Sequence, residues 1–118
     1  MSILIVDESL VSRTFISDLL TKFGYEDLLL CDSIEDAYRK ICFHEPEKAA
    51  SDLDLILLDI NLPGKSGIDA CLELSDHPVF CDVPVIIISG SDYLDGLDAA
   101  FTAGAIDFII KPPMYLPL

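Results

Sequence analysis

Three acidic residues and a lysine stand where they could do chemistry, each at the end of a short apolar run. Asp7 and Glu8 follow the run SILIV, Asp59 follows LILL, and Lys111 follows AIDFII. Carboxylates that crowd together repel one another, and a cation among them relieves that repulsion. Mg²⁺ prefers a few carboxylate oxygens plus water and leaves room for a phosphoryl oxygen. These residues therefore predict a magnesium site that neutralises a phosphoryl group, which is the charge problem of phosphoryl transfer.

The apolar runs before these residues predict buried strands. Leu55–Leu58 is unbroken and bounded by polar and turn residues, which is typical of a parallel strand buried on both faces. Four further runs have the same character, and they are Ser2–Val6, Asp27–Cys31, Val83–Ile88 and Ala105–Ile110. Open α/β sheets bind ligands at the carboxyl ends of their strands. We expect Ser89, which follows the fourth run, to add a hydroxyl donor at that edge.

Segments with a helical spacing of apolar residues separate the predicted strands. They are Leu10–Phe23, Ile34–Cys42 with Asp32-Ser33 as its cap, about Ser66–Leu74, and Asp92–Ala103. In the last segment the predicted inward residues are Leu94, Leu97, Ala100 and Phe101. Strands that alternate with helices imply right-handed crossovers. The sequence therefore predicts an α/β fold with a doubly wound, five-stranded parallel sheet, and one domain over residues 1–118.

Composition narrows the class of protein. The formal net charge of −14 disfavours direct binding to nucleic acid or to an anionic membrane. Hydrophobic residues make up 52% of the chain, which argues against disorder. The N-terminus has no signal-like segment, no run approaches transmembrane length, and the four cysteines have neither zinc-site spacing nor disulfide-like clustering. These features favour a cytoplasmic protein with reduced thiols.

Four segments, taken in order, resemble the receiver domain of bacterial two-component response regulators. The first strand and acidic pair of that family are matched by ILIVDES, and the phosphoacceptor strand and its loop by LILLDINLPGKSG. The fourth strand with its switch hydroxyl is matched by VIIISGS, and the fifth strand with its lysine and proline by GAIDFIIKPP. The resemblance covers nearly the whole chain. It implies a flavodoxin-like sheet with strand order 2-1-3-4-5 and a phosphorylation-dependent signalling switch.

The resemblance also implies a role for each residue at the predicted edge. Asp59 is the implied phosphoacceptor. Asp7 and Glu8 are the implied acidic pair that serves Mg²⁺, together with the backbone carbonyl of Asn61. Lys111 is implied to pair with the phosphoryl group.

Two further residues are implied to report the phosphorylation state. Ser89 would bond a phosphoryl oxygen after transfer, and Phe108 would be the aromatic whose rotamer follows. Phenylalanine lacks the hydroxyl with which a tyrosine could anchor to the surface, so we expect its ring to prefer the inside. The implied phosphoryl donor is a sensor histidine kinase or a histidine phosphotransfer protein, with an output partner that the sequence does not name. Such a domain is not an enzyme, because it assists only its own phosphorylation and dephosphorylation.

The chain departs from the family pattern at Glu8 and at its C-terminal end. The second acid is commonly Asp, and the longer Glu8 side chain moves its carboxylate outward. After Lys111 and an implied cis bond to Pro112, the expected fifth helix is missing or truncated. We therefore expect apolar residues of the first helix and fifth strand to be exposed. That face would self-associate or be partly covered by Met114–Leu118.

Other functions remain open at this point. A pseudo-receiver, which keeps the fold as a protein-interaction module but is not phosphorylated, is favoured by Glu8. A flavodoxin-like FMN protein needs a Ser/Thr/Gly-rich phosphate loop after the first strand, and the acidic Asp7-Glu8 has the wrong charge. A phosphatase with an Asp-x-Asp motif would need a general acid where Asn61 stands.

Overall fold

The computed structural model describes residues 1–49, 52–90 and 94–111 of the chain. In these ranges strands and helices alternate as β1 (Ser2–Val6), α1 (Leu10–Lys22), β2 (Asp27–Cys31), α2 (Ile34–Ile41), the 3-10 turn η1 (Pro46–Lys48), β3 (Leu53–Asp59), α3 (Gly67–Ser75), β4 (Val85–Ser89), α4 (Leu94–Thr102) and β5 (Asp107–Ile110). The five strands form one parallel sheet in the order β2-β1-β3-β4-β5. The predicted flavodoxin-like fold class and strand order are therefore confirmed.

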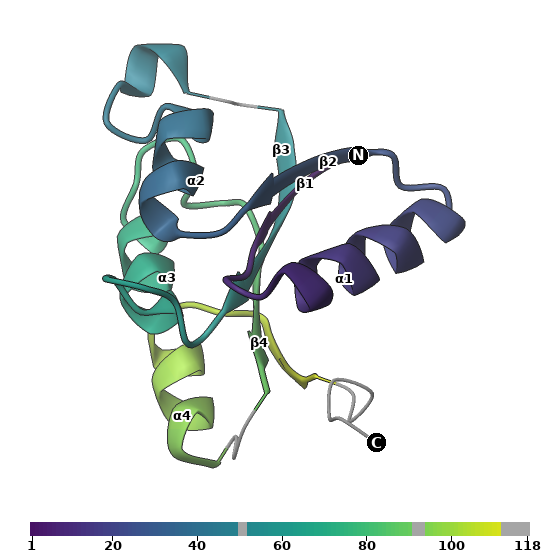
Figure 1. Ribbon diagram of the computed structural model, residues 1–118. Helices are drawn as coiled ribbons and strands as arrows, with labels where there is room; N and C mark the ends of the chain where they lie inside the picture. The colour runs from purple at the N-terminus through teal and green to yellow at the C-terminus, as the bar shows by residue number, and fades with distance from the viewer. Residues whose placement is uncertain (50–51, 91–93, 112–118) are drawn as a thin grey trace.

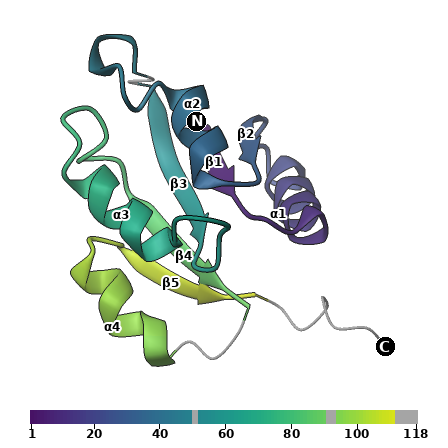
Figure 2. The ribbon, with the colours of Figure 1, turned by 60° about the vertical axis from the view of Figure 1, so that its left-hand side comes forward.

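The helices lie on the two faces of the sheet in unequal numbers. Helix α1 covers one face, and α2, α3 and α4 cover the other (Figure 1). A view turned by 60° shows α2, α3 and α4 in succession along the sheet (Figure 2). Serine side chains begin three of the helices, because the hydroxyl oxygens of Ser9, Ser33 and Ser66 accept backbone N–H groups of the first turns of α1, α2 and α3.

Alternate residues of the central strands supply two apolar cores. On the side of α2–α4, Leu4 and Val6 of β1 pack with Ile56 and Leu58 of β3, all at most 1% exposed. On the side of α1, the neighbouring residues Ile3, Ile5, Leu57 and Ile88 form the second core. Because β1 and most of β3 are buried on both faces, these strands appear as unbroken apolar runs in the sequence.

The bounds of three strands differ from the predicted ones. Strand β3 begins at Leu53 and includes Asp59. Strand β4 begins at Val85 because Pro84 has no N–H to donate, although the Pro84 carbonyl accepts the Ile56 N–H at 3.0 Å. Strand β5 begins at Asp107 because the Ala105 N–H donates instead to a carbonyl of the preceding helix.

The prediction that Phe101 points inward is wrong, since its side chain is 45% exposed. Among the α4 residues whose side chains are described, Ala100 is buried, as is Ala103 just after the helix, and Phe101 is turned away from that line. Leu97 is half-buried, whereas the Leu94 side chain and residues 91–93 lie outside the described part of the chain.

The apolar face predicted for α1 is only partly buried. Phe15, Ile16 and Leu20 are half-buried, but Leu10 is 68% exposed and Phe23, which caps the helix, is 71% exposed. Part of this helix borders a groove of about 240 Å³ shared with β5.

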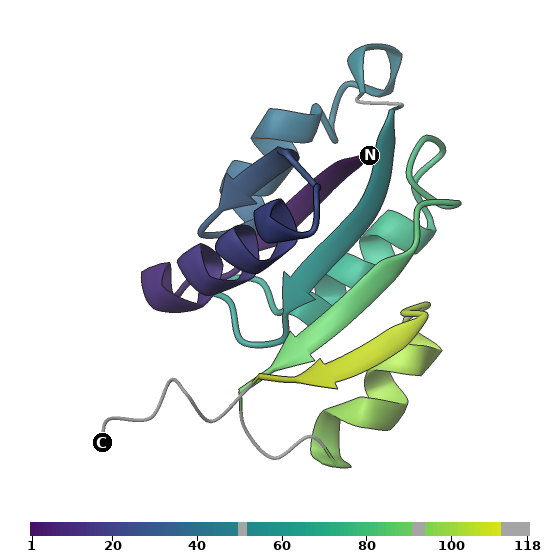
Figure 3. The same ribbon diagram turned by 90° about the vertical axis from the view of Figure 1, so that its right-hand side faces the viewer.

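The exposed apolar face expected between the first helix and the fifth strand is present. Ile109 and Ile110 of β5 are 45% and 48% exposed, and Leu19 of α1 is 43% exposed. Seen from the α1 side, β5 has no described helix in front of it (Figure 3). The predicted cis bond to Pro112 and the predicted covering segment Met114–Leu118 lie outside the described residues.

Within residues 1–49, 52–90 and 94–111, no helix is long and apolar enough to cross a membrane. Cys31, Cys42, Cys71 and Cys81 are free thiols, and burial raises the pKa of Cys31 to about 11. The thiol of Cys31 is therefore a packed side chain of β2 and a poor nucleophile at neutral pH.

Candidate functional site

Strand register brings the polar strand ends into line at one edge of the sheet. Val6 pairs with Leu58, so Asp7 stands beside Asp59. Asp59 in turn pairs with Ile88, and Ser89 pairs with Ile110. The polar residues at the ends of these strands therefore lie at the same edge of the sheet, as predicted for parallel strands.

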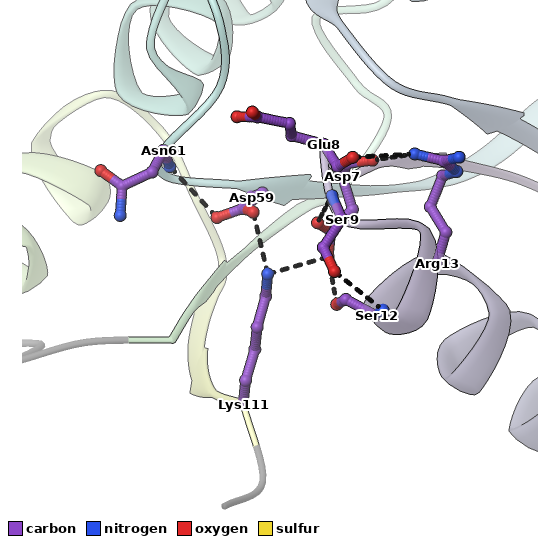
Figure 4. Close-up of polar contacts among 8 residues, drawn as sticks. All are labelled: Asp7, Glu8, Ser9, Ser12, Arg13, Asp59, Asn61 and Lys111. Atoms are coloured by element: carbon purple, nitrogen blue, oxygen red, sulfur yellow. Dashed lines mark hydrogen bonds and ion pairs between the residues drawn. The ribbon is translucent and has the colours of Figure 1, made fainter. Parts of the chain in front are cut away.

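Lys111 joins the two buried aspartates of this edge. Its Nζ lies 2.8 Å from Oδ2 of Asp59 and 2.9 Å from Oδ2 of Asp7. The carboxylates belong to nearly inaccessible residues, Asp7 at 2% and Asp59 at 6% exposure. Figure 4 shows the ammonium group between the two carboxylates. Because both acids share one lysine, this trio keeps one uncompensated negative charge when both are ionised.

Residues of α1 and of the β1–α1 turn fix Asp7 from the other side. Oδ1 of Asp7 accepts the Ser9 N–H at 2.9 Å, and Oδ2 accepts the hydroxyl of Ser12. The guanidinium of Arg13 donates to the backbone carbonyls of Asp7 at 2.7 Å and of Glu8 at 3.2 Å. Both the side chain and the backbone of Asp7 are therefore held by hydrogen-bond donors (Figure 4).

The two aspartates have pKa values shifted in opposite directions. Burial raises the pKa of Asp7, but hydrogen bonds from Ser12, Lys111 and the Ser9 backbone outweigh burial and bring it below its ordinary value. Burial also raises the pKa of Asp59, and here Lys111 and the Asn61 N–H offset only part of the rise while the charge of Asp7 adds to it. Burial lowers the pKa of Lys111, but its bonds to the two carboxylates raise it above the ordinary value.

Asn61 and Glu8 border this group without joining it. The backbone N–H of Asn61 donates to Oδ1 of Asp59 at 3.1 Å, and its side chain is exposed. Glu8 is exposed, and Figure 4 shows its carboxylate extending away from Asp7 and Lys111. Among the described residues, no three His, Cys, Asp or Glu side chains are already gathered as a metal site.

The donor set of this edge fits a hard divalent cation. Asp7 and Asp59 supply carboxylate oxygens. The exposed side chain of Glu8 follows Asp7 directly, and the backbone carbonyl of Asn61 comes two residues after Asp59. Mg²⁺ takes oxygen ligands of this kind and keeps several waters. The uncompensated charge on the buried aspartates is what such a cation would neutralise.

The two predicted switch residues, Ser89 and Phe108, lie on neighbouring strands and on the same face of the sheet. Ser89 ends β4 and is 1% exposed, and its backbone carbonyl accepts the Lys111 N–H at 2.7 Å. The half-buried Phe108 packs against the core beneath α2–α4. Its ring atoms Cε2 and Cζ come within 3.6 and 3.7 Å of where a Cβ on Gly96 of α4 would stand. The expected inward placement of Phe108 therefore agrees with its packing in the structure.

Three residues that shape the site were not predicted from the sequence, and they are Ser12, Arg13 and Gly67. Ser12 occurs among apolar residues of a predicted helix, and a polar residue at a position facing a sheet is a signal that could have singled it out. Arg13 donates to backbone carbonyls, which leaves no trace in the residue pattern. Gly67 begins α3 against the backbone of Asp59, and a Cβ there would stand 2.2 Å from the Asp59 carbonyl oxygen.

Comparisons with known proteins agree with this arrangement. The family model "Response regulator receiver domain" matches residues 3–114. Chemotaxis protein CheY1 of Helicobacter pylori is 29% identical over 112 residues, which cover 95% of this chain and 86% of CheY1.

Solved structures are similar in fold. The crystal structure of a response regulator receiver domain from Rhodospirillum rubrum has a TM-score of 0.86 at 24% identity and covers 98% of this chain and 83% of its own. The receiver domain of a sensor histidine kinase from Pseudomonas aeruginosa PAO1, solved with a magnesium ion coordinated in its active-site cleft, has a TM-score of 0.75 at 25% identity, with 94% and 84% covered. With the family model spanning nearly all of its residues, this chain belongs to the response regulator receiver domains of two-component signalling, a family of phosphoacceptors.

Proposed function

We propose that Asp59 accepts a phosphoryl group from a phosphohistidine of a sensor histidine kinase or a histidine phosphotransfer protein. The observation that carries this proposal is the contact between Lys111 Nζ and Oδ2 of Asp59, at 2.8 Å, on a carboxylate held at a rigid strand end. Residues 1–118 then act as one receiver domain, a switch that assists only its own phosphorylation and dephosphorylation.

The transfer needs a nucleophile and a way to handle negative charge. A carboxylate oxygen of Asp59 forms the new O–P bond while the P–N bond of the donor breaks and the imidazole takes back its electron pair. Lys111 then neutralises a phosphoryl oxygen, since its ammonium already reaches Asp59. Asp7 is less suited to be the acceptor, because Ser9, Ser12 and Lys111 all donate to its carboxylate.

Mg²⁺ is the cofactor that this edge supports. Asp7, Asp59, the backbone carbonyl of Asn61 and Glu8 would hold it, with Glu8 acting directly or through a water. When bound, the ion supplies positive charge that offsets the phosphoryl oxygens. A similar receiver domain of known structure has magnesium in its cleft, which supports this assignment.

Glu8 can be tested by comparing two substitutions. Glu8→Asp should leave the Mg²⁺ affinity equal or higher, because it restores the acid common in the family. Glu8→Gln should lower the affinity, because it removes a negative charge from the ligand set. Isothermal titration calorimetry measures both, and an unchanged affinity in Glu8→Gln would show that Glu8 is a bystander.

Phosphorylation would change the surface formed by Ser89 and Phe108. A Ser89 hydroxyl drawn towards a phosphoryl oxygen vacates space that the Phe108 ring can fill. Since Phe108 already packs against the core, we expect a biased equilibrium between the two states. A structure with a phosphoryl analogue in which Ser89 and Phe108 keep their present positions would contradict this coupling.

The alternative is a pseudo-receiver that binds partners without being phosphorylated, and the exposed Glu8 is the observation that favours it. Intact-mass analysis after incubation with acetyl phosphate and Mg²⁺ separates the two functions. The phosphoacceptor proposal predicts one added phosphoryl mass in the wild type and in Asp54→Asn, a matched control on the same strand. It predicts no addition in Asp59→Asn. A wild type that gains no phosphoryl mass would favour the pseudo-receiver.

A further inference from the structure

Ser12 is the single buried residue of α1, and it is polar. Its exposure is 1%, whereas the apolar residues of the same helix are half-buried or exposed. Burying a hydroxyl costs free energy unless the group is hydrogen-bonded. The presence of a serine at the most buried position of this helix therefore calls for a bond that an apolar side chain could not make.

That bond is made to the acidic site. The hydroxyl of Ser12 donates to Oδ2 of Asp7, the same oxygen that lies 2.9 Å from Nζ of Lys111. A serine inside a helix often donates to a backbone carbonyl one turn earlier. Here the bond goes to a side chain five residues earlier, so it links the start of α1 to the carboxyl end of β1.

The backbone of Ser12 is tied to the same turn as Asp7. Its own N–H donates to Oγ of Ser9 at 3.2 Å, which fixes the first turn of the helix. The Ser9 N–H occupies Oδ1 of Asp7, so the two oxygens of the carboxylate have separate donors. Ser9 and Ser12 therefore each donate to a different oxygen of the Asp7 carboxylate (Figure 4).

We infer that Ser12 is a positioning residue that holds Asp7 toward Lys111 and Asp59 and thereby sets the divalent-cation affinity of this edge. The inference rests on the proposed function, in which Asp7 is a Mg²⁺ ligand. Residues that hydrogen-bond to metal ligands orient them, and losing one typically costs on the order of 10-fold in metal affinity or more. Ser12 does not itself reach the cation, and its effect passes through Asp7.

Calorimetric titration with Mg²⁺ provides the first test. Ser12→Ala should weaken binding roughly 10-fold, since the Asp7 carboxylate loses the donor that comes from α1. Ser12→Thr keeps the hydroxyl and should recover most of that loss. The control is Ser17→Ala, the same substitution about 140° further round α1 by helical geometry, and it should leave the affinity unchanged. Equal affinities for the wild type and Ser12→Ala would overturn the inference while leaving the proposed function intact.

A second measurement needs no metal and tests whether Ser12 acts through Asp7. Ser12→Ala should lower the urea midpoint of the wild type but leave that of Asp7→Ala nearly unchanged, because the acceptor of its bond is already gone. Equal losses in the two backgrounds would show a role in the helix alone and overturn the inference. A wild type that binds no Mg²⁺ would refute the metal part of the proposed function and the inference with it, even where the urea coupling is found.

Discussion

Replacing Gly67 with alanine should disturb the very strand end that carries Asp59. A Cβ on Gly67 would stand 2.2 Å from the Asp59 carbonyl oxygen and 3.1 Å from Cα of Ile60. An ordinary C···O contact is about 3.3 Å, so the start of α3 or the end of β3 would have to move by about 1 Å. Both groups are backbone, so no side-chain rotation relieves the clash. The same movement would stretch the 3.0 Å hydrogen bond from the Gly67 N–H to the Ile60 carbonyl.

The expected cost follows from these contacts. Overpacking that shifts backbone costs about 3 kcal/mol, and alanine returns about 1 kcal/mol through its helix propensity, which leaves a net loss of about 2 kcal/mol. Urea unfolding followed by circular dichroism measures the free energy of unfolding. The control is Gly90→Ala, whose Cβ would meet, among the residues that the structure describes, only Cδ of Lys111, at 3.4 Å. This substitution should cost less than about 0.5 kcal/mol. A Gly67→Ala variant as stable as Gly90→Ala would refute the reasoning.

Three further predictions follow from the same geometry. Asp59→Asn should raise the free energy of unfolding at neutral pH by about 1 kcal/mol. The pKa of Asp59 is raised in the folded state, so ionised Asp59 destabilises that state at neutral pH, and asparagine removes this cost. This gain in stability over the wild type should vanish as the pH falls below the ordinary pKa of an aspartate. A gain that instead grows on acidification, measured by urea unfolding, would contradict the prediction. Gly96→Ala, whose Cβ would stand 2.5 Å from Cδ1 of Ile60, should cost about 1 kcal/mol in unfolding free energy and be partly rescued by Ile60→Val. In sedimentation velocity, the weight-average mass of the wild type should rise with protein concentration, and that of Ile109→Ser should rise less. A strictly monomeric wild type would refute self-association through the exposed apolar face.

Sequence reasoning located the site because strand ends obey a simple rule. In a parallel sheet the residue after each strand lands at one edge, so short apolar runs sufficed to place Asp7, Asp59, Ser89 and Lys111 together. The rule does not say which atoms meet. That Oδ2 of Asp7 receives both the Ser12 hydroxyl and Lys111 depends on the path of the turn from β1 into α1.

The errors have equally local causes. Helical spacing marked Ala100 and Phe101 as inward alike, and a one-residue step around a helix turns the side chain by about 100°. Only Ala100 faces the core, where Ala103 is also buried. Two strands begin later than predicted. Pro84 has no N–H to donate to the sheet, and the N–H of Ala105 donates to the carbonyl of Ala100 in α4. Neither event changes the apolar pattern from which the strands were predicted.

The measurement that tests the central claim most directly is chemical mapping of the phosphorylated residue. Protein treated with acetyl phosphate and Mg²⁺ is reduced with borohydride, which converts an aspartyl phosphate into homoserine, and the peptides are sequenced by mass spectrometry. Phosphoryl transfer to Asp59 predicts homoserine at position 59 in the wild type and nowhere else, with none formed when Mg²⁺ is chelated. Homoserine at position 7 or 54, or unmodified Asp59 under conditions that phosphorylate a known receiver domain, would contradict it.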